Sequence, residues 1–506
     1  MLEILAQFVP GSVWIKIIFL LFVITLIAAI VSALQSDLPP GPMGLPIVGC
    51  YLSLLRRDQH HVFYGWTRTY GPLISFRVGS VLVVVANDAH TIQAIHSNNR
   101  LSGRPKWPTL DALSAGGLNM AFQPTTRNND LYSKHKKLVW DHFHKFKKME
   151  QAITDEGSIL CRNIEQNGIG KEFEPSRFLN LAVLSIIHRQ IFGRPLGIED
   201  PFYEQFFQAL YPVVDTLRCT HWLNVFPMLQ FVPGMGRRRI RDNCKQLWDA
   251  FRPRFQHSLK TFKENGQDGS DSLVSDFLAN ADGTVSCLSY EEIIAGKEEH
   301  PGPFSGSSIQ ATLLDTFVAA TATTCSTFTW IILHLVEDPS LQQRIRDEID
   351  QLARLEWSKP REDLPLLFSF IREILRMYRN VPLPYCAEND TTLNGYRIPK
   401  GTVILQNSWS LHNNESWDEP AVFNPNRFLD TTPSDTAEKN WQPFSSGRRK
   451  CPGKDMAEME LFLLTARLLK KFKFEADPEC PPDPNPDPAS RIKRANNFKV
   501  VCQKCE

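Results

Sequence analysis

The first feature of the hydrophobic pattern is an uninterrupted apolar run near the N-terminus. Ile17 to Leu34 contains no charged residue, and only Thr25 and Ser32 are polar. As a helix this run would be about 27 Å long, close to the ~30 Å hydrocarbon core of a bilayer. Lys16 lies at its edge, where a long cationic side chain can reach the headgroups. We therefore predict that residues 1–36 form a membrane anchor.

A cleaved signal peptide is the alternative, because Val31-Ser32-Ala33 resembles a cleavage site. Two features favour a retained anchor. The segment before Lys16 carries Glu3 and no positive charge, and the apolar run is longer than the core of a typical signal peptide. Arg56 and Arg57 follow the run, which favours a cytosolic location for the rest of the chain.

A stiff segment separates this run from the remaining sequence. Leu38 to Pro46 contains four prolines and two glycines, and proline fixes φ and cannot continue a helix. We predict that residues 37–48 are a semi-rigid spacer and that residues 49–506 form one large folded domain.

Beyond the spacer, short β signals flank a long helical region. Ile74 to Val78 alternates between apolar and polar residues and Val81 to Val85 is β-branched, so Gly79-Ser80 between them predicts a hairpin. Helical periodicity dominates from about 130 to 380. Strand and turn signals return over 389–412, with a turn at Asn394-Gly395.

The longest predicted helix spans Gln310 to Glu337, which contains no Gly or Pro and ends at Asp338-Pro339. It is apolar on most faces, so we expect it to pass through the core. A polar segment from Gly296 to Ser308 precedes it and has no evident role. The whole pattern predicts a mostly α fold with a minor β portion.

Composition narrows the class of protein. The 506 residues carry a net charge of +1 with 42% hydrophobic residues, which is typical of a globular protein. A nucleic-acid binder would show a basic excess, so we expect no nucleic-acid partner. The 11 cysteines are odd in number and predict a reducing compartment rather than a disulfide framework.

The strongest chemical signal is Cys451, which lies on a Gly-rich loop just before a predicted helix running from Lys454 to about Phe472. A helix N-terminus favours the thiolate, and a thiolate can bind heme iron as an axial ligand. The loop supplies further candidate heme contacts: Arg449 for a propionate, Phe444 to cover the sulfur, and Gly447 and Gly453 for close backbone approach. The alternative is a buried, unreactive cysteine.

These residues match the pattern Phe-x-x-Gly-x-Arg-x-Cys-x-Gly, and the chain resembles the cytochrome P-450 family over nearly its whole length, most closely the microsomal animal-type branch. The resemblance implies a single heme domain with a long central helix, heme b (iron protoporphyrin IX) as cofactor, and Cys451 as the axial ligand of the iron. It also implies an endoplasmic reticulum membrane location with a single-pass N-terminal anchor.

The family places a buried charge network behind the heme. Glu373 and Arg376 match its Glu-x-x-Arg motif, and Arg427 lies in Phe423-x-Pro425-x-Arg427-Phe428. The resemblance implies that the three residues pair with one another. Removing one partner of such a buried set costs about 3–5 kcal/mol, whereas the alternative, an exposed helical ion pair, contributes less than about 1 kcal/mol.

The oxygen-side segment of the family corresponds to Ala319 to Thr324. Thr323 matches the threonine that contacts dioxygen, and Ala319 and Ala320 are implied heme contacts. Ala320 replaces a usual glycine, and Ala322 replaces the acid that usually relays protons. We interpret Asp315, two turns earlier, as structural. The alternative for the threonines is core packing with hydroxyls bonded back to the helix.

Other implied contacts are less specific. Arg104, in Leu101-Ser102-Gly103-Arg104-Pro105, is a candidate propionate ligand. Tyr132 and Lys136 lie where relatives have Trp-x-x-x-Arg, and Tyr385 lies where relatives often have a histidine. The substrate pocket is expected to involve residues 107–122, 217–236, 316–320 and 381–387, which are largely apolar and favour a lipophilic substrate.

Two basic regions suggest contacts outside the protein. The first is either a solvated helix face or a docking site for an acidic electron donor. It consists of Lys134, Lys136, Lys137, Lys145, Lys147 and Lys148, with Arg448, Lys450 and Lys454. The second, an apolar stretch over 226–234 followed by Arg237, Arg238, Arg239 and Arg241, is either ordinary core or a second membrane contact.

Together these features predict a membrane-bound monooxygenase that inserts one oxygen atom of O2 into a lipophilic molecule. The chain has no dinucleotide or flavin fingerprint, so we expect NADPH–cytochrome P-450 reductase to supply electrons, with a microsomal b-type cytochrome as a further candidate donor. A peroxide-driven or rearranging enzyme, for which Ala322 is the motivation, and a non-catalytic heme sensor are the alternatives.

Overall fold

The structure of the chain is a computed structural model. It describes residues 11–33, 37–55, 58–123, 131–216, 221–232, 237–265, 271–281, 285–296, 302–378, 383–429, 436–486 and 493–505. The chain divides into two compact units: unit 1 comprises Met1–Pro105, Cys219–Met228 and Leu383–Ser410, and unit 2 comprises Lys106–Arg218, Leu229–Pro382 and Leu411–Glu506. The expected boundaries of anchor, spacer and heme domain stay a prediction.

Unit 1 is built on a mixed sheet with strand order β1-β2-β7-β4. Its strands are β1 (Leu73–Val78), β2 (Val81–Ala86), β4 (Tyr385–Cys386) and β7 (Val403–Gln406). β1 and β2 are antiparallel with Val78 opposite Val81, which confirms the predicted hairpin. β7 runs parallel to β2. The helical segments of this unit are α2 (Gly11–Ala33), α3 (Gln59–Tyr70), α4 (Ala89–Ser97) and α10 (Trp222–Val225), with the 3₁₀ turns η1 (Leu52–Leu54) and η2 (Asn99–Leu101).

A second hairpin in unit 1 confirms the predicted turn at Asn394-Gly395. Strands β5 (Thr391–Leu393) and β6 (Tyr396–Ile398) pair on either side of it. Asn394 has φ 49° and Gly395 has φ 84°, the pair of positive values that a tight primed hairpin turn needs. The expectation of strands and turns up to residue 412 was wrong at its end, because α18 (Ser408–Asn413) is a helix.

Unit 2 is mostly helical. Its helices are α5 (Pro108–Leu113), α6 (Leu131–Phe143), α7 (Phe146–Asn167), α8 (Pro175–Phe192), α9 (Phe202–Val214), α11 (Arg237–Asn265), α12 (Leu273–Ala279), α13 (Tyr290–Ile294), α14 (Gly306–Glu337), α15 (Pro339–Asp350), α16 (Pro360–Asp363), α17 (Pro365–Met377), α19 (Thr436–Asn440) and α20 (Lys454–Lys471). A small sheet, of order β3-β9-β8, consists of β3 (Glu172–Phe173), β8 (Phe472–Ala476) and β9 (Val500–Lys504). Short 3₁₀ turns are η4 (Pro425–Phe428) and η5 (Gly447–Arg449), and η3 (Pro227–Phe231) begins in unit 1 and ends in unit 2.

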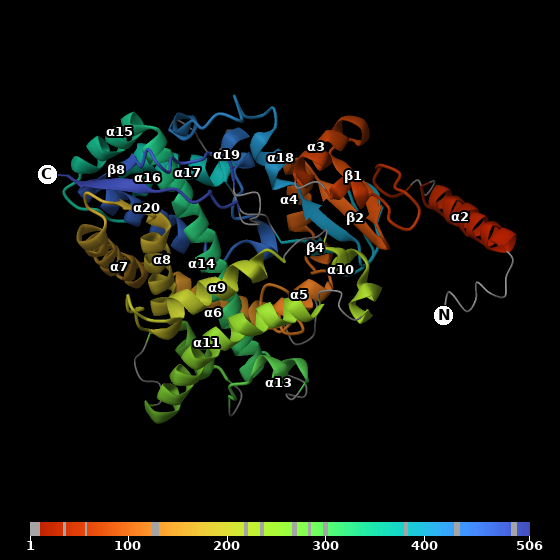
Figure 1. Ribbon diagram of the computed structural model, residues 1–506, viewed down its shortest axis with the longest axis horizontal. Helices are drawn as coiled ribbons and strands as arrows, with labels where there is room; N and C mark the ends of the chain where they lie inside the picture. Colours follow the sequence, from red (N-terminus) through yellow and green to blue (C-terminus); the bar gives the residue numbers. More distant parts are fainter. Residues whose placement is uncertain are drawn as a thin grey trace. The chain divides into compact units, whose positions relative to one another are not determined.

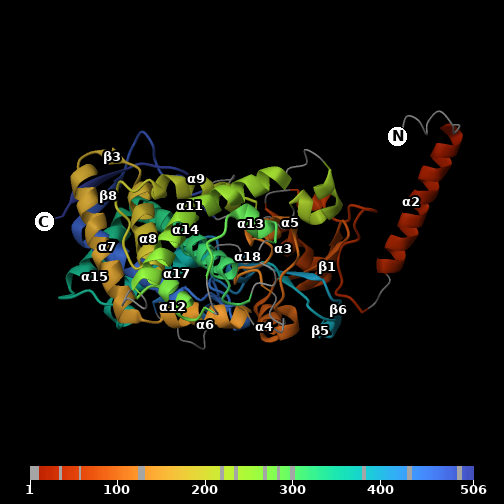
Figure 2. The same ribbon diagram turned by 90° about the horizontal axis from the view of Figure 1, so that it is seen from below.

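The long helix α14 is the central element of unit 2. It packs against α8, α17 and α20 (Figure 1), and Figure 2 shows these helices from a second direction. It ends at Glu337 as predicted but begins four residues before Gln310, because Ser305 caps it by accepting from the Ser308 N–H. Gly306 is required there, since a Cβ would lie 2.1 Å from the Ser286 carbonyl oxygen.

The polar segment predicted over Gly296 to Ser308 is therefore partly helical. Ser307 and Ser308 are buried in the first turn of α14, whereas residues 297–301 lie outside the described part of the chain. The sequence did not predict this start of the helix, because a run of serines resembles a polar loop. In the structure the serine hydroxyls cap the first turn of α14 and hydrogen-bond to one another.

The N-terminal apolar run is helical as α2 (Gly11–Ala33). Most of its described apolar side chains, such as Ile18 and Phe19, are exposed, and it contains a shorter apolar stretch, Ile15–Ile24. Among the described residues, α14 is the one helix of sufficient length and hydropathy to cross a membrane, but 78% of its most apolar window is buried inside the protein. Residues 1–10, 34–36, 56 and 57 lie outside the described residues.

Candidate active site

Cys451 lies on a tight loop that joins α19 to α20. The Cys451 N–H donates to the Phe444 carbonyl oxygen at 3.0 Å, and Ser445 and Gly447 have φ values of 60° and 68°. Glycine readily adopts this left-handed conformation, which explains Gly447 in the loop. At Gly453, the N-cap of α20, an added Cβ would meet no protein atom within 4 Å. The surface beside Cys451 is therefore open enough for a flat group to approach the backbone.

Burial raises the pKa of the Cys451 thiol, while the Gly453 N–H and the Lys136 ammonium lower it. The helix terminus and the nearby cation therefore oppose desolvation, and a bound metal cation would favour the thiolate further. No group of three or more His, Cys, Asp or Glu residues that could hold a metal ion is found in the described part of the chain. A single sulfur donor fits a metal whose other ligands come from a macrocycle, as in heme.

Cationic groups crowd together beside this cysteine. Tyr132 Oη donates to the Arg448 carbonyl oxygen at 2.6 Å, and Lys136 Nζ donates to the same oxygen. The Arg449 guanidinium lies 4.1 Å from the centre of the Tyr132 ring. Burial, and then the charges of Lys450, Arg449 and Arg448, lower the pKa of Lys136 to about 8. Such a cluster favours an anion, and the two carboxylates of heme meet that requirement.

Both arginines predicted to bind propionates donate to main-chain carbonyls in this structure. Arg449 in unit 2 donates to Met120 at 3.3 Å, to Ala121 at 3.4 Å and to Gln123. Arg104 in unit 1 donates to Leu383 at 3.3 Å and Pro384 at 2.8 Å, and its guanidinium lies 4.9 Å from the Tyr385 ring centre. Their pairing with heme carboxylates stays a prediction.

A solvent-accessible surface interrupts the middle of α14. Ala319 is exposed and Ala320 and Thr323 are half-buried, although most of this helix is buried. Thr323 Oγ1 donates to the Ala319 carbonyl oxygen at 2.8 Å, which is the back-bonded arrangement that the packing alternative predicted. Ala322 is buried. The described residues thus present small side chains and one hydroxyl at this surface.

Asp315 has a structural partner in the segment that also binds Arg449. Its Oδ2 accepts from the Ala121 N–H at 3.1 Å, and Thr312 Oγ1 accepts from the Met120 N–H at 3.2 Å. Sequence reasoning missed this attachment, and it also missed His135. The two ring nitrogens of His135 contact Thr312 Oγ1 and the Pro303 carbonyl oxygen, and no local motif marked either residue.

The structure brings Glu373, Arg376 and Arg427 together. Arg376 donates to Glu373 at 2.7 and 2.8 Å, and Arg427 Nε donates to it at 3.0 Å. The side chains of Glu373 and Arg376 are 0% exposed and that of Arg427 is 8% exposed. Remaining donors reach carbonyls, for example from Arg376 to His412 at 2.7 Å. The charges are therefore satisfied by one another and by the backbone.

Part of the basic run is already neutralised. Lys145 Nζ lies 2.7 Å from Asp271, which Lys148 also contacts, and Lys137 pairs with Asp141 at 2.5 Å. The two lysines lower the pKa of Asp271 to about 2 despite its partial burial. Lys136 faces the cysteine loop rather than solvent. The cationic surface left for an acidic donor is thus smaller than the sequence indicated.

In the 226–234 stretch, Met228, Phe231 and Val232 are exposed, which disagrees with the core alternative. Arg238 and Arg239 are exposed as well. Residues 217–220, 233–236, 381 and 382, predicted to line the substrate pocket, lie outside the described residues.

Comparison with known proteins identifies the family. The cytochrome P-450 family model matches residues 39–501. The steroid 17-alpha-hydroxylase/17,20 lyase of Capra hircus is 31% identical over 446 residues, which cover 85% of each chain. The enzyme of the same name from Squalus acanthias is 28% identical over 480 residues, covering 92% of this chain and 91% of the relative.

The solved structures that match this chain also belong to cytochrome P-450 proteins. A zebra fish cytochrome P-450 with progesterone matches with a TM-score of 0.72 and 25% identity, covering 88% of this chain and 99% of the other. A structure with abiraterone matches with a TM-score of 0.71 and 25% identity, covering 89% and 100%. The chain belongs to the cytochrome P-450 family of heme-thiolate monooxygenases.

Proposed function

We propose that the chain is a membrane-bound monooxygenase that inserts one oxygen atom of O2 into a steroid-like lipophile. The observation that carries this proposal is the open surface on α14 at Ala319 and Thr323, together with the single thiol of Cys451 in its cationic surroundings. The lipophilic class is supported by relatives named as steroid 17-alpha-hydroxylase/17,20 lyase and by the progesterone in the name of a structural neighbour.

Heme, when bound, supplies the redox chemistry that activates O2. The protein's own residues hold and surround it. Cys451 is the proposed iron ligand, and Lys136 and Arg449 would provide cations for the two carboxylates of the heme. The small side chains of Ala319 and Ala320 would leave room for a bound heme and O2 beside α14. The Thr323 hydroxyl must leave the Ala319 carbonyl, 2.8 Å away, before it can donate elsewhere.

The proposed electron supply is NADPH through the separate reductase, with a microsomal b-type cytochrome as a further candidate. The cations available for docking are those outside the Asp271 and Asp141 pairs, which leaves Lys134 and Lys147 with Lys450 and Lys454 on the exposed surface. The proposed location is the endoplasmic reticulum membrane, supported by the exposed apolar side chains of α2 and by Met228 and Phe231.

The test is Cys451→Ser in the full chain, expressed in microsomes with the reductase. We expect wild type to show the strongly red-shifted Soret band of a reduced, CO-bound heme thiolate and to oxidise progesterone with NADPH and O2. Cys451→Ser should lose both signals, with Cys480→Ser as the matched control that keeps them. An unchanged band in Cys451→Ser would exclude this ligand. Turnover with peroxide but none with NADPH and reductase would support the peroxide-driven alternative.

A further inference from the structure

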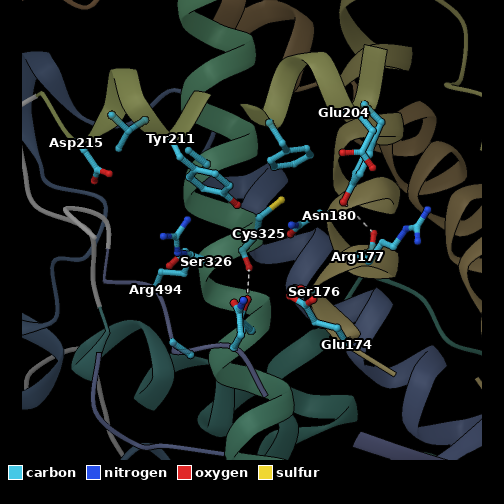
Figure 3. Close-up of a pocket in the computed structure, with 17 residues that line it drawn as sticks. Glu174, Ser176, Arg177, Asn180, Glu204, Tyr211, Asp215, Cys325, Ser326 and Arg494 are labelled. Atoms are coloured by element: carbon cyan, nitrogen blue, oxygen red, sulfur yellow. Dashed lines mark hydrogen bonds between the residues drawn. The ribbon is translucent and has the colours of Figure 1, made fainter. Parts of the chain in front are cut away.

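A cavity of about 410 Å³ lies in unit 2 between α8, α9, α14 and the segment 494–497, and Figure 3 shows its lining. It includes none of the residues proposed to hold heme. One wall is a row of aromatic rings on α9, with centres 5.0 Å apart for Tyr203 and Phe207 and 5.8 Å apart for Phe207 and Tyr211. The opposite wall consists of small side chains of α14, including Cys325 and Ser326.

The wall of the cavity on α14 is uncharged, and its hydroxyl groups are already hydrogen-bonded to main-chain carbonyls. Ser326 Oγ donates to the Lys493 carbonyl oxygen at 2.8 Å, and Thr329 Oγ1 donates to the Cys325 carbonyl oxygen at 3.0 Å. Burial raises the pKa of the Cys325 thiol well above its usual value, so this side chain is a neutral, weakly polar surface. The space between the aromatic rings of α9 and the small side chains of α14 suits a flat apolar molecule.

One end of the cavity is a hydrogen-bonding site. The Arg494 guanidinium lies 4.2 Å from the Tyr211 ring centre. Burial raises the pKa of Tyr211 to about 12, while hydrogen bonds from Arg494 and Asn180 lower it in part. Because the Tyr211 oxygen accepts from Arg494 and Asn180, the Tyr211 hydroxyl proton is directed away from both and can be donated to an acceptor oxygen of a ligand. The rim carries charges of both signs, Glu174, Arg177, Glu204 and Asp215, which gives no advantage to a charged ligand.

We propose that this cavity is a second binding site for a flat, uncharged lipophile with an acceptor oxygen at one end, such as a steroid ketone. The proposal rests on the proposed function, because it assigns the same chemical class to a second position. With about 100° of rotation per residue, the α14 residues that line the cavity, Ala322, Cys325, Ser326 and Thr329, are centred about a quarter of a turn away from the centre of the Ala319 and Thr323 face. Ala322, which lines the cavity, is the direct neighbour of Thr323, so a molecule in the cavity would contact the turn of α14 that carries the Thr323 hydroxyl.

The test counts sites on the heme-loaded full chain with radiolabelled progesterone. Equilibrium dialysis measures all bound steroid, whereas a Soret titration reports only the molecule beside the heme. We expect a second equivalent per heme in dialysis that the Soret titration does not detect. Asn180→Trp, which fills the polar end, should remove this equivalent and leave the Soret titration unchanged. Gln208→Trp, on an exposed position of α9 that does not line the cavity, is the matched control.

Arg494→Leu removes donors without filling space, and we expect it to weaken the second site about tenfold, or about 1.4 kcal/mol. A single equivalent in wild type, or a second equivalent that survives in both Asn180→Trp and Arg494→Leu, would overturn the proposal. The CO spectrum of every variant reports folding and heme binding separately. A chain without the thiolate spectrum would contradict the proposed function rather than the second site.

Discussion

Two clusters of charge in unit 2 differ in how their charges are balanced. Around Glu373, one carboxylate pairs with two guanidinium groups, and all three side chains are buried. Around Lys136, four cationic groups crowd beside Cys451, and burial together with their mutual repulsion lowers the pKa of Lys136 to about 8. In the first cluster, protein groups alone balance the charges and satisfy the hydrogen bonds. The second is electrostatically unfavourable unless an anion neutralises it.

This difference separates a residue that stabilises the fold from one that binds a cofactor. A satisfied buried network contributes to the fold whether or not a ligand is present. A crowded cluster of like charges costs stability in the free protein, and the protein recovers that cost when an anionic ligand binds. Opposite effects of substitution on protein stability and on heme retention should therefore distinguish the two clusters.

The largest effect is expected for Glu373→Gln, which leaves Arg376 and Arg427 buried without their carboxylate. We expect a loss of about 3–5 kcal/mol in the free energy of unfolding, seen as little or no folded heme protein in the CO spectrum and by circular dichroism. Asp141→Asn is the matched control, because it breaks the exposed pair with Lys137 and should cost less than about 1 kcal/mol. Equal losses in both variants would contradict the comparison.

The second prediction concerns pH and His135, which lies on α6 next to Lys136. Burial lowers the pKa of His135 to about 4, whereas its usual value is 6.5. The unfolded chain therefore takes up this proton first, so stability is full above pH 6.5 and falls as the pH decreases toward 4. The difference corresponds to about 3 kcal/mol. Burial gives His188 the same shift, so the two histidines act together.

Thermal unfolding followed by circular dichroism between pH 7 and pH 4 measures this effect. His135→Gln should be less stable at pH 7, because it loses the contact with Thr312, but its melting temperature should fall less steeply with acid. His257→Gln, on an exposed position of α11, should keep the wild-type slope. An unchanged slope in His135→Gln would mean that protonation of His135 does not destabilise the fold.

The third prediction tests the unfavourable cluster directly. Lys136→Met removes one of the crowded cations, so we expect the stability of the heme-free chain to stay the same or rise. Heme should leave this variant about tenfold faster, equivalent to about 1.4 kcal/mol, in a transfer assay to excess apomyoglobin. Lys137→Met, on the same helix but exposed, should change neither quantity. A loss of heme-free stability in Lys136→Met would mean that this lysine stabilises the fold.

Local patterns in the sequence predicted much of this architecture. Pro339 stops α14 at Glu337 as expected, and Asn394-Gly395 forms its hairpin turn, because each signal acts on its own residues. The start of α14 was missed because a serine cap resembles a loop in sequence. The loop of Cys451 could be recognised because its residues are adjacent along the chain.

Contacts between distant segments could not be predicted in this way. Arg449 donates to the Met120 carbonyl oxygen across a separation of 329 residues. Every residue has a main-chain carbonyl, so the sequence does not indicate which one accepts from Arg449. Asp271 neutralises Lys145 and Lys148, although the sequence presented these lysines as free charge. Likewise, the side of α14 on which Ala322 lies depends on packing with α8 and α9.

The smallest expected effect concerns proton delivery near Thr323. No acid stands at position 322, so we expect protons to reach the O2 side through the Thr323 hydroxyl and ordered water. Part of the NADPH consumed should then appear as hydrogen peroxide. Thr323→Ala should lower product formed per NADPH about twofold to fivefold further, a difference of less than about 1 kcal/mol. Thr323→Ser keeps the hydroxyl and is the matched control.

Ala322→Asp tests whether an acid at position 322 can deliver protons to the O2 side in this chain, or whether that position faces the wrong side of α14 to do so. Ala322 is buried and lines the cavity between α8, α9 and α14, so an aspartate there would enter that cavity beside Cys325 rather than the surface of Ala319 and Thr323. Burial would raise its pKa and keep it protonated. We therefore expect Ala322→Asp to leave the ratio of product to NADPH low. Restored coupling in this variant would mean that α14 rotates or opens when substrate binds. Tight coupling in wild type with no loss in Thr323→Ala would instead mean that the substrate itself supplies the proton.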